Sequence, residues 1–263
     1  GLTIADVTLI RDGSTLDLTG TPITQVSPTQ YEIDLTQFTR LDGTVLDAEG
    51  MEQSVTAILP GQYVLTVNAA SGMVVDQAGN PFATDVSDSW VIDLSGPVAA
   101  LAGLPTSTIN TAVGLVTVTF DEPVSGVDLD DFSLTRDGSA VSLAGVPFVA
   151  VDAMTYTLDL SSVTTLGGSY QLALTGTDSG IADGVGNTIA GDTIGSFEID
   201  KTAPTATLET VTPNPRSSAV GVLTVTFDES VSGVDLDDFS LTLGGEAVDL
   251  SGVAVTQISE SRY

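Results

Sequence analysis

Residues 116–135 read VTVTFDEPVSGVDLDDFSLT, and residues 223–242 read LTVTFDESVSGVDLDDFSLT. The two stretches differ at two positions only, and their offset is 107 residues, from Phe120 to Phe227. Self-similarity at this period indicates repeated whole domains, because solenoid units are only about 20–50 residues long. A degraded third copy opens the chain, where residues 1–9 align with residues 126–134. The sequence therefore predicts three near-copies of one domain, over residues 1–94, 95–201 and 202–263.

The middle copy alternates apolar and polar residues with a period of two, which is typical of half-buried strands, and helical periodicity is hard to find. The alternation is clearest over residues 116–120, 156–160 and 170–174, and Asp137-Gly138 marks a tight turn. About seven short strands in a repeat of this length match the size of an immunoglobulin-like (Ig-like) sandwich. We expect an all-β fold of tandem Ig-like β-sandwich domains, with the first and third repeats incomplete.

Comparison of the copies predicts what each outer repeat lacks. The first copy lacks its first two strands, and the third lacks its last two, because Tyr263 is the counterpart of Tyr156. Either the polypeptide continues at both ends, or neighbouring molecules lend strands to the open sheet edges. The first copy also carries an 18-residue insertion near residues 40–57, expected to be a surface loop or an extra hairpin. Trp90 stands where the middle copy has Phe197 and is interpreted as a core residue; the alternative is a tryptophan that stacks on sugars.

The charge of the chain limits its partners. It has 35 Asp and Glu against 6 Lys and Arg and no His, a net charge of −29. Such a chain repels nucleic acid and anionic membrane surfaces, and divalent cations are its natural counter-ligands. The scarcity of lysine also fits a protein kept soluble in high salt. No apolar run is long enough to span a bilayer, and no signal-peptide pattern is found at Gly1, although a signal could lie outside this stretch.

The missing residue types also limit the chemistry. The chain has no cysteine, so disulfides and thiol chemistry are excluded. Without His and Cys, the Ser–His and Cys–His catalytic arrangements are impossible. A carboxylate pair for glycoside hydrolysis is left open, but it needs a cleft that small sandwiches rarely supply. We therefore expect a protein that is not an enzyme.

Sandwich topology predicts where the carboxylates gather. If the strands run alternately up and down, the linker, the loop after residues 116–120 and the loop near Asp183 meet at one pole of the domain. Clustered carboxylates without His or Cys suit a hard cation, Ca²⁺ before Zn²⁺ or Cu²⁺. The alternative is that these residues serve turns and solvation alone. The carboxylates that topology places at the first junction are Asp93, Asp121, Glu122, Asp128, Asp130, Asp131, Asp178 and Asp183, and the third copy repeats the pattern with Asp200, Asp228, Glu229, Asp235, Asp237 and Asp238.

Several landmarks together carry a resemblance to a known family. Residues 118–135, the strands of Tyr156 and Tyr170, the run DGVGN at 183–187 and the run IDKTAP at 199–204 resemble bacterial Ig-like domains. Those domains are found in large repetitive adhesins and biofilm-associated surface proteins. The resemblance implies secretion to the bacterial cell surface, tandem extension and calcium between modules. The ligands that it implies, from the linkers and the adjoining loops, are Asp93, Asp121, Glu122, Asp183, Asp200, Asp228 and Glu229. The first copy departs from this pattern through its insertion and through Leu94-Ser95-Gly96 in its linker.

Three hypotheses for function follow. The first is a non-enzymatic extracellular stalk of an adhesin or cell-surface filament, stiffened by Ca²⁺ at its joints. The second is a self-assembling filament, sheath or surface-layer subunit, completed by strands from neighbouring molecules. The third is an adhesion module that binds a glycan or a protein through the insertion or an adjacent loop. The expected partners are neighbouring repeats or subunits of the same protein and, under the third hypothesis, a surface or glycan receptor.

Overall fold

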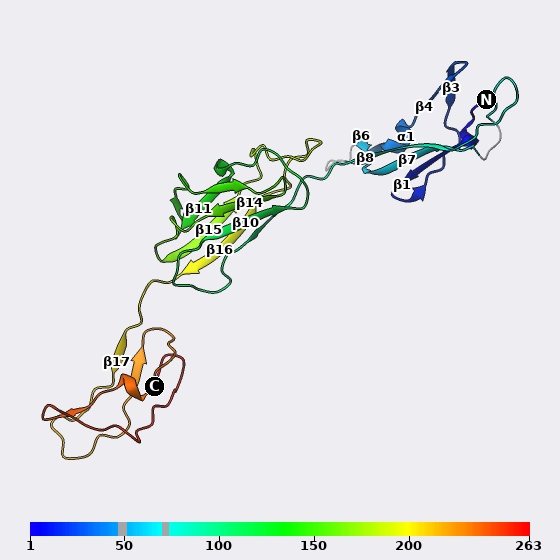
Figure 1. Ribbon diagram of the computed structural model, residues 1–263. Coiled ribbons are helices and arrows are strands. Elements are labelled where there is room, and N and C mark those ends of the chain that lie inside the picture. Colours follow the sequence, from blue (N-terminus) through cyan, green and yellow to red (C-terminus); the bar gives the residue numbers. More distant parts are fainter. Residues whose placement is uncertain (47–51, 70–73) are drawn as a thin grey trace.

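The computed structural model describes residues 1–46, 52–69 and 74–263, with the backbone alone for residues 41–46 and 52–56. Figure 1 shows that the strands fall into three groups that follow one another along the chain. We refer to them as the first unit (β1–β8, within residues 7–92), the middle unit (β9–β16, within 99–199) and the third unit (β17–β20, within 206–247). The exact boundaries given above, after residues 94 and 201, stay predictions.

The middle unit is an Ig-like β-sandwich. Its strands are β9 (Ala99–Ala102), β10 (Leu115–Phe120), β11 (Phe132–Arg136), β12 (Ser139–Val141), β13 (Phe148–Ala150), β14 (Thr155–Asp159), β15 (Gly168–Leu174) and β16 (Thr193–Ile199). They form two antiparallel sheets, in the orders β13-β14-β10-β9 and β12-β11-β15-β16. The first order matches strands D-E-B-A of an Ig domain, and the second matches C-F-G with one more strand beside C. The expected all-β Ig-like fold is confirmed, with eight strands where about seven were expected.

The core of the middle unit lies between these sheets and follows from the alternation in the sequence. Val116, Val118 and Leu158 have no exposed surface, while the threonines between them on β10 and β14 face outward. Burial of each such side chain contributes about 1.5–3 kcal/mol. The turn predicted at Asp137-Gly138 is confirmed, because both residues have positive φ (51° and 76°) and Arg136 pairs with Ser139. This two-residue connection suits a right-handed twisted hairpin.

A tyrosine near the start of the F strand fixes the corner between strands E and F. The hydroxyl of Tyr170 donates to the carbonyl oxygen of Leu166 at 2.9 Å, and that of Tyr63 lies 2.9 Å from the carbonyl oxygen of Leu59. Each ring stacks on an aromatic residue of the G strand, Tyr170 on Phe197 and Tyr63 on Trp90. This contact is the tyrosine corner of Ig-like sandwiches. Trp90 is half-buried against the core cluster of the first unit, so its interpretation as a core residue is confirmed.

The first unit contains η1 (Ile4–Asp6), β1 (Val7–Arg11), β2 (Ser14–Thr15), β3 (Ile23–Ser27), β4 (Gln30–Ile33), α1 (Thr36–Thr39), β5 (Arg40–Leu46), β6 (Glu52–Ile58), β7 (Gly61–Val67) and β8 (Val86–Ile92). Its sheet β2-β1-β7-β8 corresponds to β12-β11-β15-β16 of the middle unit, while β3 and β4 pair only with each other. The insertion forms the antiparallel hairpin β5–β6, so the extra hairpin, and not a plain surface loop, is the alternative that is confirmed. Its residues 47–51 lie outside the described residues. The hairpin ends beside the exit of the unit, because Gly61 pairs with Ile92.

The third unit has less regular structure than its sequence predicts. It contains β17 (Ala206–Leu208), β18 (Val225–Phe227), η4 (Leu236–Asp238), β19 (Thr242–Leu243) and β20 (Glu246–Ala247). The backbones of Tyr263 and Val225 exchange two hydrogen bonds, as the pairing of β14 with β10 in the middle unit predicts. No side chain of residues 202–263 is buried. Leu241 is 53% exposed whereas its counterpart Leu134 is 1% exposed, because no strand equivalent to β15 packs beside it.

Candidate cation site at the first junction

Three carboxylates meet between the first linker and the upper loops of the middle unit. Oxygens of Asp93, Glu122 and Asp183 all lie within 4.8 Å of one another. Two oxygens that bind one Ca²⁺ at about 2.4 Å each are at most about 4.8 Å apart, so this spacing fits a shared calcium ion. No Lys or Arg of the described residues forms an ion pair with any of the three. We call Asp93, Glu122 and Asp183 the acid triad.

Topology brings the triad together. Asp93 follows Ile92, the last residue of β8, and Glu122 lies two residues beyond the end of β10. Asp183 lies in the loop between β15 and β16, which corresponds to the F–G loop of an Ig domain. Ser125 and Ala182 exchange two backbone hydrogen bonds, of 2.9 and 3.1 Å, which join this loop to the one that carries Glu122.

Asp183 is held by its own loop. It is 6% exposed, and its Oδ1 accepts the backbone N–H groups of residues 185, 186 and 187 at 2.7–2.9 Å. The side-chain amide of Asn187 donates to its Oδ2 at 2.8 Å. Burial acts to raise the pKa of Asp183, but the hydrogen bonds from Asn187 and the neighbouring N–H groups outweigh it, so the pKa lies below its ordinary value. Asp183 therefore stays ionised and preoriented.

The pKa of Glu122 is shifted in the opposite direction to that of Asp183. Partial burial raises the pKa of Glu122, and the negative charges of Asp183, Asp93 and Asp121 raise it further. The half-buried carboxylate thus lies in a strongly negative local potential. A divalent cation relieves this kind of repulsion, which is the electrostatic reason why the donor set suits one.

Asp121 and its counterpart Asp228 lie outside the triad and bind the backbone of the strand that enters each unit. Oδ1 of Asp121 accepts the N–H of Val98 at 2.8 Å. Asp228 accepts the N–H of Thr205 at 2.7 Å and its hydroxyl at 2.6 Å. Both residues were expected among the metal ligands, and the structure gives each of them a hydrogen-bonding role at the start of its unit.

At the second junction, Asp200 and Glu229 are the counterparts of Asp93 and Glu122. Asp200 and Glu229 both line a cavity of about 590 Å³ beside residues 108–111 and 230–232. Within residues 1–46, 52–69 and 74–263, the acid triad is the only group of three possible ligands at metal-binding distance. Of the seven predicted ligands, the structure thus brings together three at the first junction and places Asp200 and Glu229 around one cavity at the second.

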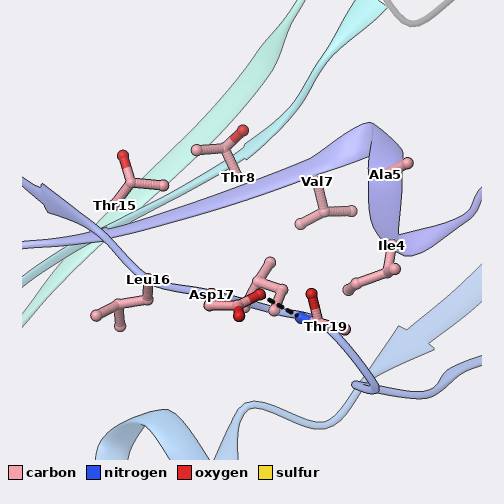
Figure 2. Close-up of a pocket in the computed structure, with 9 residues that line it drawn as sticks. Ile4, Ala5, Val7, Thr8, Thr15, Leu16, Asp17 and Thr19 are labelled. Atoms are coloured by element: carbon pink, nitrogen blue, oxygen red, sulfur yellow. Dashed lines mark hydrogen bonds between the residues drawn. The ribbon is translucent and has the colours of Figure 1, made fainter.

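A further cavity, of about 550 Å³, lies on the first unit. Figure 2 shows Ile4 and Val7 at η1 and β1, opposite the segment that carries Leu16 and Thr19. Its carboxylate, Asp17, accepts the N–H of Thr19 at 2.9 Å and so serves a local turn. Without a second acid or base on the lining, this cavity offers no catalytic arrangement.

No helix in the described parts of the chain has the length and hydropathy that a membrane span requires. No protein-family model and no curated protein sequence matches the chain.

Several solved structures align with it. The N-terminal part of the bacterial S-layer protein SbsC is 19% identical, over 63% of this chain and 37% of that one, with a TM-score of 0.28. The chain therefore spans little more than a third of that S-layer fragment. Titin I-band domains I67–I69 are 11% identical, over 88% of this chain and 79% of that one, with a TM-score of 0.29. Titin Z1Z2, solved in complex with telethonin, is 13% identical, over 73% of this chain and 79% of that one, with a TM-score of 0.24. At these scores the assignment as tandem Ig-like domains rests on strand order and register.

Proposed function

We propose that the chain is part of a non-enzymatic, extracellular stalk of Ig-like units on a bacterial surface, and that Ca²⁺ at the acid triad stiffens its first joint. The observation that carries the proposal is the meeting of Asp93, from the linker, with Glu122 and Asp183, from two loops of the next unit. When bound, the ion would supply a positive charge shared by all three carboxylates. Linker and loops would then be held together, and bending at the joint would cost free energy.

The magnitudes suit an extracellular module. Such modules bind Ca²⁺ with dissociation constants of about 10⁻⁴–10⁻³ M. At a free concentration ten times that constant, binding would add about 1.4 kcal/mol to the folded, joined state. Three carboxylates supply only part of the six to eight oxygens that Ca²⁺ takes, so backbone carbonyls and water would supply the others.

The chain offers a matched pair of variants for the test. Glu122→Gln removes a triad carboxylate, and Glu229→Gln makes the same change at the equivalent position of the third unit, where no triad exists. Equilibrium dialysis with Ca²⁺ should show one fewer bound ion in the first variant only. Saturating Ca²⁺ should raise the unfolding temperature of the wild type and of Glu229→Gln but not that of Glu122→Gln. Equal calcium binding in both variants, or unfolding temperatures that Ca²⁺ leaves unchanged in all three proteins, would contradict the proposal.

A second candidate is self-assembly of surface-layer type, in which strands from neighbouring copies would complete the third unit. Leu241 and Leu243 are 53% and 77% exposed, and strands from a second copy or from a continuing polypeptide could cover them. Sedimentation velocity over a range of concentrations tests this, with growth of a larger species expected and a constant monomer as the contrary result. Glycan or protein binding through the insertion stays a prediction, since the side chains of residues 41–56 lie outside the described part.

A further inference from the structure

The first linker is hydrogen-bonded to the middle unit from its first residue onward. The carbonyl oxygen of Asp93 accepts the side-chain amide of Asn187 at 3.2 Å, and that of Pro97 accepts the N–H of Ala190 at 3.0 Å. Asp93 directly follows Ile92, which is paired with β7 in the sheet of the first unit. Not one free residue therefore separates the end of β8 from the first hydrogen bond to the middle unit.

Gly96 permits this path. A Cβ atom on Gly96 would lie 1.8 Å from the carbonyl oxygen of Thr188 and 2.9 Å from its carbon. Both distances are shorter than real Cβ contacts, and the atoms met belong to the backbone, which cannot rotate away as a flexible side chain could. The second linker carries Ala203 at the equivalent position. The first linker is thus the one whose sequence allows this close approach.

Asn187 connects the linker to the acid triad. One amide hydrogen bond goes to Asp93 in the linker at 3.2 Å and the other to Asp183 at 2.8 Å, so the side chain fixes two triad residues. The first unit repeats this loop at residues 76–80, where the amide of Asn80 donates to Asp76 at 2.8 Å. Among the described residues, no linker contacts Asn80 through a hydrogen bond. Asn80 therefore provides a matched control within the same chain.

We propose that Asn187 and Gly96 act as positioning residues that clamp the first linker onto the middle unit and hold the joint before any cation binds. The amide supplies the hydrogen bond, and the missing side chain lets the linker lie against the loop backbone. The clamp rests on the proposed function in one respect: a stiff joint is useful only if the chain is a stalk. Its contacts with the linker join neutral groups, the amide of Asn187 with the carbonyl of Asp93 and Gly96 with the backbone of Thr188, so they need no bound cation.

The absence of cysteine makes a direct measurement possible. Cysteines introduced at exposed positions Gln62 on β7 and Gln171 on β15 would carry spin labels across the joint. In chelator, the doubly labelled chain should give one narrow distance distribution. Asn187→Ala or Gly96→Ala should broaden it, because release of the four residues 93–96 adds a spread on the order of 10 Å. Asn80→Ala should leave the width unchanged, and thermal unfolding checks that each variant is folded.

The outcomes separate the clamp from the calcium proposal. A folded Asn187→Ala variant that keeps the narrow distribution in chelator would overturn the clamp. A wild type that is broad in chelator and narrows only with Ca²⁺ would overturn the clamp while it supports the stalk joint. A wild type that is narrow in chelator and binds no Ca²⁺ would support the clamp and contradict calcium at the triad.

Discussion

The hydroxyl oxygen of Thr164 accepts the backbone N–H of Val113 at 2.9 Å and lies 3.1 Å from the carbonyl oxygen of the same residue. Thr164 is fully buried and lies between β14 and β15, while Val113 precedes β10, 51 residues earlier. The same hydroxyl lies 2.9 Å from the carbonyl oxygen of Leu160, so its one hydrogen has two acceptors, while the N–H of Val113 depends on this side chain for its own.

Thr164→Val should therefore destabilise the middle unit by about 1–3 kcal/mol, because it leaves a buried N–H without an acceptor. Thr164→Ser should recover most of that loss. Thr39→Val is the matched control, since the hydroxyl of Thr39 contacts only the carbonyls of its own turn, at 3.3 and 3.4 Å. Urea unfolding of the three variants measures the differences. Equal losses for Thr164→Val and Thr39→Val would contradict the interpretation.

The tyrosine corner gives a second prediction. Tyr170→Phe removes the hydrogen bond to Leu166 and should cost about 1 kcal/mol. Tyr156→Phe removes a hydroxyl from an equally buried ring, but no described residue hydrogen-bonds that hydroxyl, so its cost should be close to zero. Thermal unfolding of the two variants tests whether the corner, and not the loss of any tyrosine hydroxyl, stabilises the sandwich.

Gly126 and Gly233 occupy the same repeat position in different surroundings. Both have positive φ, 87° and 83°. A Cβ on Gly126 would lie 2.4 Å from the carbonyl oxygen of Gly180, whereas a Cβ on Gly233 would have no other atom within 4 Å. Gly233→Ala should therefore cost only the backbone strain, about 1–2 kcal/mol. Gly126→Ala should cost more, since it also separates the two loops that form the acid triad. Calcium binding should weaken with Gly126→Ala and stay unchanged with Gly233→Ala; the reverse order would refute this assignment.

The raised pKa of Glu122 predicts how stability depends on pH. Because the folded chain holds this proton more tightly than the unfolded chain, the stabilisation is complete below the ordinary glutamate pKa of 4.5 and is lost as pH rises through the raised value. In chelator at neutral pH, Glu122→Gln should therefore unfold at a higher temperature than the wild type, and the difference should vanish in acid.

Added Ca²⁺ should reverse that order, because the wild type alone keeps all three carboxylates of the triad. Calorimetric scans from acid to neutral pH, with and without Ca²⁺, measure both effects. A Glu122→Gln variant less stable than the wild type in chelator at neutral pH would contradict the electrostatic account of the triad.

The middle unit was predictable because its strands alternate cleanly and because a near-identical stretch recurs at a fixed offset. The tyrosine corner was not, since nothing in the pattern around Tyr170 shows which carbonyl its hydroxyl reaches. The third unit departs from its own sequence pattern, because residues such as Leu241 stay exposed without a strand beside them, whatever their alternation indicates.

All three members of the acid triad were among the predicted ligands, but the sequence did not separate Glu122 from its neighbour Asp121. Alternation of strand direction indicates that linker and loops share a pole. Adjacent side chains in an extended segment point to opposite sides, and the sequence does not say which side faces the linker. In the structure, Asp121 accepts the N–H of Val98, whereas Glu122 belongs to the triad. The sequence alone does not distinguish these two roles. The role of Gly96 could not be predicted from the sequence, because it depends on contact with the backbone of Thr188, some 90 residues away.

The placement of carboxylates in the middle unit has a consequence for how such chains meet each other. Of the twelve Asp and Glu between residues 99 and 199, only Asp159 and Glu198 lie on strands, and the others occupy turns, loops and the short 3-10 helix Leu129–Asp131. The negative charge of the middle unit is therefore concentrated at its loops and leaves the flat sides of its sheets nearly neutral. Two such chains lying side by side would repel least when these loops are staggered, so the spacing of the charged loops would set the register of a bundle.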